Sequence, residues 1–334
     1  MKRITILLTA ITIFALLLIG CTNLTDDAEK TTDAVTTGPV VEANLASDFE
    51  YIENEDGNIV IKRYVGDVTD VVIPETIDGK TVTEIGSNSF SNNYKLISVT
   101  IPNTVINIQN SAFYQCAFLV EINLPENLRS IGAGAFEGCS KLSTITLPSS
   151  LESLLNAAFK NCSALTHIRI PKSITRWGFD TFMDSGLETI EFEGGLSSIG
   201  DTAFAGTNIS EVVLPGSIEA IGDGAFGACS NFESVTLSEG IISIGDHAFG
   251  GVSKLTEIVI PKSVKNITEF AFSGCGTLEK VVFEGDAPEG YIYPYEEMPI
   301  EPLDVNYTVY YYEGAEGFTS PEWNGYKSAV IENK

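Results

Sequence analysis

Basic residues are scarce in this chain of 334 residues, and histidine is scarcer still. Nineteen Lys and Arg stand against 45 Asp and Glu, so the formal net charge is −26, and only two His occur. A nucleic-acid partner requires a basic face that neutralises phosphate, and a polybasic membrane-surface module requires one too. The composition therefore excludes both classes, and two His leave little for a His-rich metal site.

Sequence signatures of catalysis are absent as well. The chain has no Gly-x-Ser-x-Gly elbow, no His-Glu-x-x-His helix and no Cys-x-x-Cys spacing, which mark serine hydrolases, zinc proteases and thiol-based metal sites. The glycine pairs at 132 and 134 and at 222 and 224 fall in turns of a repeat and predict no phosphate-binding loop. We expect no enzymatic activity, no cofactor and no metal. One alternative stays open, because neighbouring repeats could bring two carboxylates together as in a glycosidase.

The N-terminal segment, residues 1–20, has the layout of a secretory signal. Met1 to Arg3 form a short basic region, and residues 4–19 form an apolar run without charge. The run is short for a helix that spans a bilayer, which needs about 20 apolar residues. Its end, Leu18-Ile19-Gly20-Cys21, resembles the lipobox of bacterial lipoproteins. This resemblance implies that residues 1–20 are removed and that Cys21 receives a lipid, which anchors the exported chain to the membrane.

Residues 21–47 have the composition of a flexible tether. Thr22 to Ser47 contains six Thr and five acidic residues, and no aromatic side chain. Such a segment buries too little apolar area to offset the entropy that ordering would remove. We therefore expect a spacer, although Val40 and Val41 could form an edge strand of the following domain.

A short sequence repeat fills most of the remaining chain, with a period of about 22–23 residues, in the range that marks stacked repeat folds. Nine phenylalanines mark it: Phe90, Phe113, Phe136, Phe159, Phe182, Phe204, Phe226, Phe249 and Phe272. The best copies read Leu-x-x-Ile-x-Leu-Pro, then Ile-Gly, then Ala-Phe-x-x-Cys, as in the copy that starts at Leu119. A fixed period of this length predicts a solenoid, in which each repeat forms one turn of a coil.

Each column of the repeat has a structural role. The Leu-x-x-Ile-x-Leu stretch alternates inward and outward as a strand does, and Pro ends it because Pro cannot donate to a continuing ladder. A second apolar column, from Ile85 to Ile267, starts the return arm. Stacking at about 4.8 Å per rung buries each Phe against the Phe of its neighbouring rungs. We expect about nine rungs and one continuous file of aromatic rings.

Five cysteines share one column of the repeat, three residues after Phe: Cys116, Cys139, Cys162, Cys229 and Cys275. A disulfide framework is one interpretation for an exported chain, because adjacent rungs bring Cα atoms within bridging range. However, five is an odd number, and small residues such as Ser185 and Thr207 occupy the same column in other copies. We therefore favour buried free thiols. In the copies with Ser185 and Thr207 the next turn is one residue shorter, and we expect these hydroxyls to satisfy its backbone.

The repeat resembles the BspA-like leucine-rich-repeat proteins of bacterial surfaces, which are built from type-5 repeats. The resemblance implies a mainly β solenoid, a right-handed coil of about nine rungs, one for each copy of the repeat, with caps at both ends. The divisions that we expect are an N-terminal cap over 48–86, the solenoid over 87–284, an acidic insertion over 285–304 and a C-terminal cap over 305–334. The resemblance also implies surface display and adhesion, without catalytic residues.

Binding residues are sought on the outward positions of the strand stretch. These positions are rich in Ser, Thr and acidic residues, and one rung differs because it carries His167 and Arg169. The candidate ligand-binding residues on this face are Glu121, His167, Arg169, Glu191 and Glu211. Trp177, close by in sequence, occupies the apolar column and is interpreted as a bulky core residue. Arg169 is also expected to pair with acids such as Glu191.

The insertion after the last repeat offers a second candidate. Between Glu284 and Asp304 lie seven acidic residues, four Pro and the tyrosines Tyr291, Tyr293 and Tyr295. Pro and charge should prevent this segment from continuing the coil, and clustered Tyr is common at recognition surfaces. A solvated loop and a calcium site are the alternatives, although no EF-hand spacing supports calcium.

The hypothesis that follows is a lipid-anchored cell-surface protein of adhesion type. Its partner would be an extracellular protein or glycan that binds an extended face of the solenoid, and its membrane contact would be the lipid on Cys21. The alternative is a structural or assembly component of the cell envelope, in which the solenoid spaces other molecules or self-associates.

Overall fold

A computed structural model describes residues 42–268, 270–288, 290–292 and 307–332, with the side chains of 290–292 left undescribed. Residues from Val41 onward belong to one compact unit, and the fold below is that of its described part. Cys21, Tyr293 and Tyr295 lie outside the described residues. Within the described ranges, no helix has the length and apolar character needed to cross a membrane.

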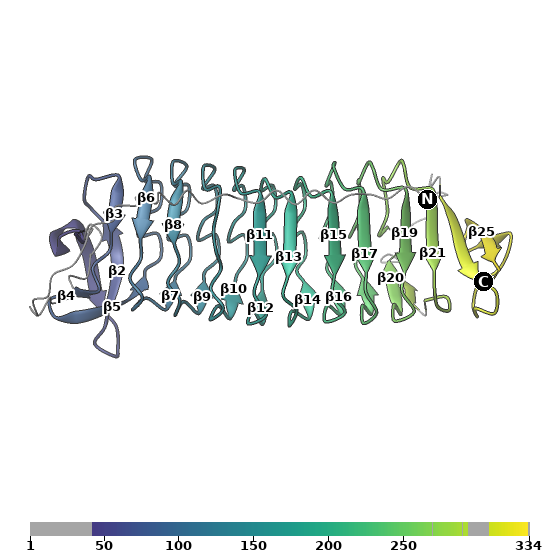
Figure 1. The fold of residues 1–334 in the computed structure, drawn as a ribbon, viewed down its shortest axis with the longest axis horizontal. Coiled ribbons are helices and arrows are strands. Elements are labelled where there is room, and N and C mark those ends of the chain that lie inside the picture. The colour runs from purple at the N-terminus through teal and green to yellow at the C-terminus, as the bar shows by residue number, and fades with distance from the viewer. Residues whose placement is uncertain (1–41, 269, 289, 293–306, 333–334) are drawn as a thin grey trace, which may run out of the picture. The chain divides into compact units, whose positions relative to one another are not determined.

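The Leu-x-x-Ile-x-Leu stretches form the first arm of the coil, as predicted. The strands of this arm are β3 (Asp70–Val72), β6 (Ser98–Thr100), β8 (Glu121–Asn123), β11 (His167–Ile170), β13 (Thr189–Phe192), β15 (Glu211–Leu214), β17 (Ser234–Leu237), β19 (Glu257–Ile260) and β21 (Lys280–Phe283). Figure 1 shows them in chain order. They pair in parallel within the groups β3-β6-β8, β11-β13, β15-β17 and β19-β21, with Ile168 opposite Ile190 and Val212 opposite Val235. Equivalent repeat positions therefore lie opposite each other.

The second apolar column forms short strands on the return arm. These are β7 (Asn107–Ile108), β9 (Ser130–Ile131), β10 (Ser153–Leu154), β12 (Arg176–Trp177), β14 (Ser198–Ile199), β16 (Ala220–Ile221), β18 (Ser243–Ile244), β20 (Asn266–Thr268) and β22 (Gly290–Ile292). They pair in parallel in two series, β7 to β12 and β14 to β22. The two arms and the turns between them enclose the core.

The N-terminal end of the coil is closed by an antiparallel hairpin. It follows the short 3₁₀ turn η1 (Ala46–Asp48) and pairs β1 (Phe49–Glu53) with β2 (Ile59–Tyr64), and β2 pairs in parallel with β5 (Lys80–Ile85). β4 (Thr76–Ile77) adds an antiparallel pair to β5. The end of the predicted tether already belongs to this fold, because the Asn44 N–H donates to the Val72 carbonyl at 2.8 Å and the Asn44 side chain accepts from the Val72 N–H.

The C-terminal end continues the first arm through the strands β23 (Thr308–Tyr312) and β25 (Tyr326–Ile331), which extend the parallel ladder of β21. A short antiparallel strand, β24 (Glu322–Trp323), then folds back on β25. The solenoid has about eleven turns, so the expected number of nine is an underestimate. The extra turns lie at the ends of the coil and depart from the repeat. Tyr64 stands where the nine copies have Phe, whereas Tyr307 directly precedes β23 and Tyr326 begins β25, so neither lies in the Phe column.

The nine phenylalanines form one continuous file through the core, as predicted. Consecutive rings from Phe90 to Phe272 have centroids 4.9 to 5.9 Å apart, and all nine side chains are buried. Tyr64 extends the file by stacking on Phe90 at 5.4 Å. This spacing is close to the expected rung separation, so each ring is covered by its equivalents in the adjacent rungs.

The five repeat cysteines are free and buried, as favoured above. Each thiol donates a hydrogen bond to the Phe carbonyl oxygen of the rung before it, as Cys139 does to Phe113 at 3.2 Å. Burial raises the pKa of Cys116 and of Cys162 to about 12. The column therefore ties successive rungs together through neutral thiols.

The acidic insertion does not leave the coil where it was expected to. Gly290–Ile292 forms β22, which pairs in parallel with β20 and places Tyr291 opposite Ile267. The expectation that residues 285–304 depart from the solenoid is therefore wrong for 290–292. The strand itself, Gly-Tyr-Ile, contains neither Pro nor charge, so neither interrupts its ladder.

Candidate functional site

The candidate residues of the first arm lie on its outer face. Along β11, His167 and Arg169 are exposed, while Ile168 and Ile170 are buried. The same alternation exposes Glu211 in β15 and Glu121 in β8. Because successive side chains of a strand point to opposite faces, the repeat pattern alone fixed which residues face outward.

His167 and Arg169, on one rung, each contact an exposed side chain of the next rung. His167 Nδ1 lies 2.7 Å from Thr189 Oγ1 on the neighbouring strand. Arg169 Nε lies 2.9 Å from Glu193 Oε1 and 3.9 Å from Glu191 Oε2. The closer acid is thus Glu193, which follows β13, rather than Glu191 of the candidate set. An exposed pair of this kind contributes roughly 0–1 kcal/mol to stability, so the guanidinium remains accessible to a partner.

Trp177 does not join this rung at the surface. It belongs to β12 on the return arm, where its ring packs between Phe182 and Phe204 with centroids 5.9 and 5.8 Å away. Its interpretation as a bulky core residue is confirmed. The indole Nε1 is buried and has no hydrogen-bond partner among the described residues, so the ring contributes packing alone.

A first groove lies where the ladder of the first arm is interrupted. Residues 142–147 match the repeat and bury Leu142, Ile145 and Leu147, yet they form no strand between β8 and β11. The cavity beside them has a volume of about 820 Å³. It is lined by carboxylates, amides and hydroxyls that include Glu121, Asn123, Glu126, Asn127, Thr144 and Thr146.

A second groove follows the next interruption, between β13 and β15. Its volume is about 630 Å³, and it brings together Glu191 and Glu211 of the candidate set. Hydroxyls of Thr189, Ser234 and Thr236 line it as well. Apolar area is also present, since Phe192 is half-buried and Val213 is 64% exposed. The arrangement suits a partner that combines hydrogen-bond donors with an apolar part.

The candidate binding residues therefore lie in separate parts of the outer face. Glu191 and Glu211 share the second groove, and Thr189 links it to His167. Glu121 lies in the first groove. No group of three or more His, Cys, Asp or Glu side chains suited to a metal ion occurs among the described residues. What the face can do chemically is bind through hydrogen bonds, charge and apolar contact.

The grooves themselves were not predicted. Residues 142–147 read Leu-Ser-Thr-Ile-Thr-Leu and follow the repeat as well as their neighbours do. The interruption depends on how closely adjacent rungs approach, which the residue types do not report. The sequence does contain one indication of the second groove. The two short copies, those with Ser185 and Thr207, directly precede β13 and β15, the strands on either side of it.

Stacked leucine-rich-repeat rungs around one core define a solenoid protein. The profile of the BspA type leucine-rich repeat region matches residues 83–208 and 197–309, with six copies. These matches cover more than half of the chain, so the chain belongs to this family.

Solved structures share the fold. The chain is similar to a leucine-rich repeat protein from Bacteroides ovatus ATCC 8483, with a TM-score of 0.67 and 24% identity over 86% of this chain and 75% of that one. Weaker similarities, which carry no argument, are to the T. pallidum leucine rich repeat protein (TM-score 0.47, 27% identity, 61% and 85% covered) and to the pneumococcal vaccine antigen PcpA (TM-score 0.41, 19% identity, 86% and 96% covered). No curated protein matches the chain.

Proposed function

We propose that this protein is a non-enzymatic, lipid-anchored binding protein of the bacterial cell surface. Membership of the BspA-type family supports a role in surface binding. The absence of catalytic motifs from the sequence supports a role without chemistry. An extracellular protein or glycan is the proposed partner, and the outer face of the first arm is the proposed binding surface.

The second groove is the observation that carries this proposal. Glu191 and Glu211 present carboxylates on either side of a break in the ladder, with Val213 largely exposed between hydroxyl side chains. An exposed Val in such a setting is an apolar contact that water does not favour. A partner with hydroxyl, amide or ammonium donors around an apolar portion would satisfy both kinds of group.

A binding screen of the full chain against extracellular matrix proteins and glycans tests the proposal. For the tightest partner, Glu191→Gln with Glu211→Gln should weaken binding at least tenfold, because each carboxylate loses its charge-assisted hydrogen bond. Glu219→Gln is the matched control, since Glu219 is exposed between β15 and β16 and outside both grooves. Equal binding by the double variant and the wild type would contradict the groove assignment.

The lipid anchor is tested separately. The support for it is the apolar run that ends in Leu18-Ile19-Gly20-Cys21. Palmitate labelling in a bacterial host should mark the wild type and leave Cys21→Ser unlabelled. Labelling of the variant at wild-type level would remove the anchor. Concentration-dependent self-association without any partner in the screen would instead favour the envelope-assembly alternative.

A further inference from the structure

Main-chain hydrogen bonds between the turns of adjacent rungs follow one rule. Three N–H groups of each turn donate to three carbonyl oxygens of the next rung: those of Ser111, Phe113 and Gln115 to those of Ala133, Ala135 and Glu137, at 2.8, 2.8 and 2.7 Å. The same three bonds recur along the described coil. The carbonyl oxygens of every turn therefore depend on the rung before it for their donors.

The first Phe-containing turn breaks this rule. Its equivalent carbonyl oxygens belong to Ser87, Ser89 and Ser91, and only that of Ser89 receives a donor, the Tyr64 N–H at 2.9 Å. The carbonyl oxygens of Ser87 and Ser91 have no protein donor among the described residues. Both residues are half-buried, so these two carbonyl oxygens are free to accept hydrogen bonds from a partner outside the chain.

The length of the preceding turn explains the missing donors. Ile61 pairs with Ile85, and Tyr64 stacks on Phe90. In this turn the ring residue Tyr64 follows Ile61 by three positions, whereas in the next rung the equivalent Phe90 follows Ile85 by five. The turn before the first Phe rung is therefore too short to cover the segment from Ser87 to Ser91.

A hollow occupies the uncovered place. Its volume is about 810 Å³, and it lies between β2 and the turn of Ser87 to Lys95. Its lining includes Lys62 and Arg63, both exposed, together with short hydroxyl and amide side chains such as Asn92. Tyr94 also lines it, with 57% of its surface exposed.

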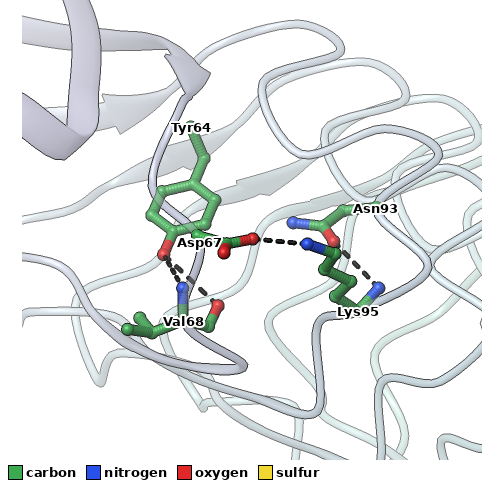
Figure 2. A network of polar contacts seen from close by, with 5 residues as sticks. All are labelled: Tyr64, Asp67, Val68, Asn93 and Lys95. Carbon is green, nitrogen blue, oxygen red and sulfur yellow. Dashed lines mark hydrogen bonds and ion pairs between the residues drawn. The ribbon is translucent and has the colours of Figure 1, made fainter.

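One wall of the hollow is held in place by a network of polar contacts (Figure 2). The Tyr64 hydroxyl donates to the Val68 carbonyl at 3.3 Å and lies 3.2 Å from the Val68 N–H. The Lys95 ammonium pairs with Asp67, and the Lys95 N–H donates to Asn93 Oδ1 at 3.0 Å. These contacts join the loop after β2 to the turn of the next rung.

Gly66 is required for this wall. A Cβ atom at position 66 would lie 2.6 Å from the Tyr64 hydroxyl oxygen, which is closer than real Cβ contacts allow. Any larger residue would displace Tyr64 or the loop. The glycine therefore preserves the contact between Tyr64 and Val68.

The charge of the hollow contrasts with that of the chain. Lys95 pairs with Asp67 at the surface, whereas Lys62 and Arg63 make no ion pair within the described part of the protein. Glu50 is the other acid in the lining, opposite Arg63 in the β1–β2 hairpin. On a chain with a net charge of −26, two adjacent unpaired cations beside unmatched carbonyl oxygens form a distinctive local environment.

We propose that this hollow binds an anionic saccharide. Sugar hydroxyls donate to the carbonyl oxygens of Ser87 and Ser91, and Lys62 and Arg63 bind the carboxylate or sulfate through charge-assisted hydrogen bonds. The exposed ring of Tyr94 packs against the apolar face of a sugar ring. A continuous peptide fits less well, because the Tyr64 main chain already occupies the middle carbonyl oxygen, that of Ser89.

This pocket shares no residue with either groove. It stands independently of the partner proposed for the outer face, and the two assignments can fail separately. The proposed ligand class follows from the cations Lys62 and Arg63 beside the two carbonyl oxygens that accept hydrogen bonds. Both grooves, in contrast, are acidic.

The test is an array of carboxylated, sulfated and neutral oligosaccharides, probed with the full chain in detergent. Hyaluronan hexasaccharide and its neutral counterpart chitohexaose form one matched pair. We expect saturable binding of anionic members, weakened at least tenfold by Lys62→Gln with Arg63→Gln and by Ser91→Trp, which fills the hollow without changing charge. The control is Lys265→Gln, because Lys265 is an exposed cation between β19 and β20.

Several outcomes would overturn the assignment. They are an array with no anionic ligand, equal binding of the neutral counterparts, and binding that the two pocket changes leave intact. A pocket that takes acidic peptides but no saccharide would overturn it as well. Circular dichroism and the melting temperature verify that each variant is folded. The variants Glu191→Gln and Glu211→Gln should leave saccharide binding unchanged.

Discussion

The rings of Phe113 and Phe136 lie parallel, with centroids 5.2 Å apart and planes inclined by only 2°. Both side chains are fully buried and come from equivalent positions of adjacent repeats. Each ring fills the space that the next one leaves, so no rung could bury its Phe alone. Stability is therefore shared between neighbours along the coil.

Removal of one ring from the middle of the file should be strongly destabilising. Phe136→Ala leaves a cavity between Phe113 and Phe159 and is expected to cost about 3–5 kcal/mol. Thermal and urea unfolding followed by circular dichroism measure the effect. Phe179→Ala is the control, since Phe179 is 53% exposed and should change stability little. Similar losses in both variants would contradict stability shared through the file.

The regular period of the repeat made this file predictable. One Phe in every copy of a stacking coil can only place the rings above one another, and the same logic placed the cysteines and the outward positions of β11 and β15. The end turns were not predictable from the period, because Tyr64 replaces Phe and follows Ile61 too closely. The same shortening creates the hollow beside β2, which the repeat pattern does not predict.

Burial of the cysteine column should make stability fall at alkaline pH. The pKa of Cys162 is raised by burial from 9.0 to about 12. Between these values the unfolded thiol loses its proton while the folded thiol keeps it, so the stabilisation present below pH 9 is lost as the pH rises. One such group contributes a slope of up to about 1.4 kcal/mol per pH unit.

Urea titrations between pH 8 and pH 11 measure that slope. Cys162→Ala should unfold with a shallower pH dependence than the wild type, whatever its stability at pH 8. Native protein should also react slowly with a thiol reagent at pH 8, because little thiolate forms. Rapid modification of the folded chain, or identical slopes for the two proteins, would contradict the burial of this thiol.

The partly buried pair of Lys160 and Asp180 should stabilise the fold at neutral pH and lose its effect in acid. Burial raises the pKa of Asp180, but hydrogen bonds from Lys160 and Thr202 outweigh burial, so the pKa is lowered overall. A carboxyl with a lowered pKa stabilises the fold above its unfolded pKa, and the stabilisation is lost as the pH falls through the folded value.

The expected result is that Asp180→Asn melts below the wild type at pH 7 and that the difference narrows below about pH 4, where the unfolded carboxyl takes up its proton. Melting temperatures at five pH values between 3 and 7 provide the measurement. Glu126→Gln serves as the control because Glu126 is exposed and forms no ion pair in the described structure. A pH-independent difference for Asp180→Asn would show that packing, not charge, is responsible.

The two short turns carry a matched pair of hydroxyls, Ser185 and Thr207, for which the sequence predicts the same role. Thr207 behaves as expected, since its hydroxyl donates to the Phe204 carbonyl oxygen at 2.8 Å and lies 3.3 Å from Cys229 Sγ. For Ser185 the expectation is wrong, because its hydroxyl is buried without a hydrogen-bond partner among the described residues. The sequence shows that a hydroxyl is present at each turn. Whether that hydroxyl forms a hydrogen bond depends on the side-chain rotamer that the packing allows.

Replacement of each hydroxyl should therefore have opposite consequences. Thr207→Val keeps the volume but removes the donor at a site that is 1% exposed, and it should cost about 1–3 kcal/mol. Ser185→Ala removes an unsatisfied polar group at a site that is 3% exposed, so the free energy of unfolding should stay the same or rise. Urea unfolding of both variants decides the matter. A larger loss for Ser185→Ala than for Thr207→Val would mean that the Ser185 hydroxyl finds a partner, such as a buried water, that stabilises the short turn.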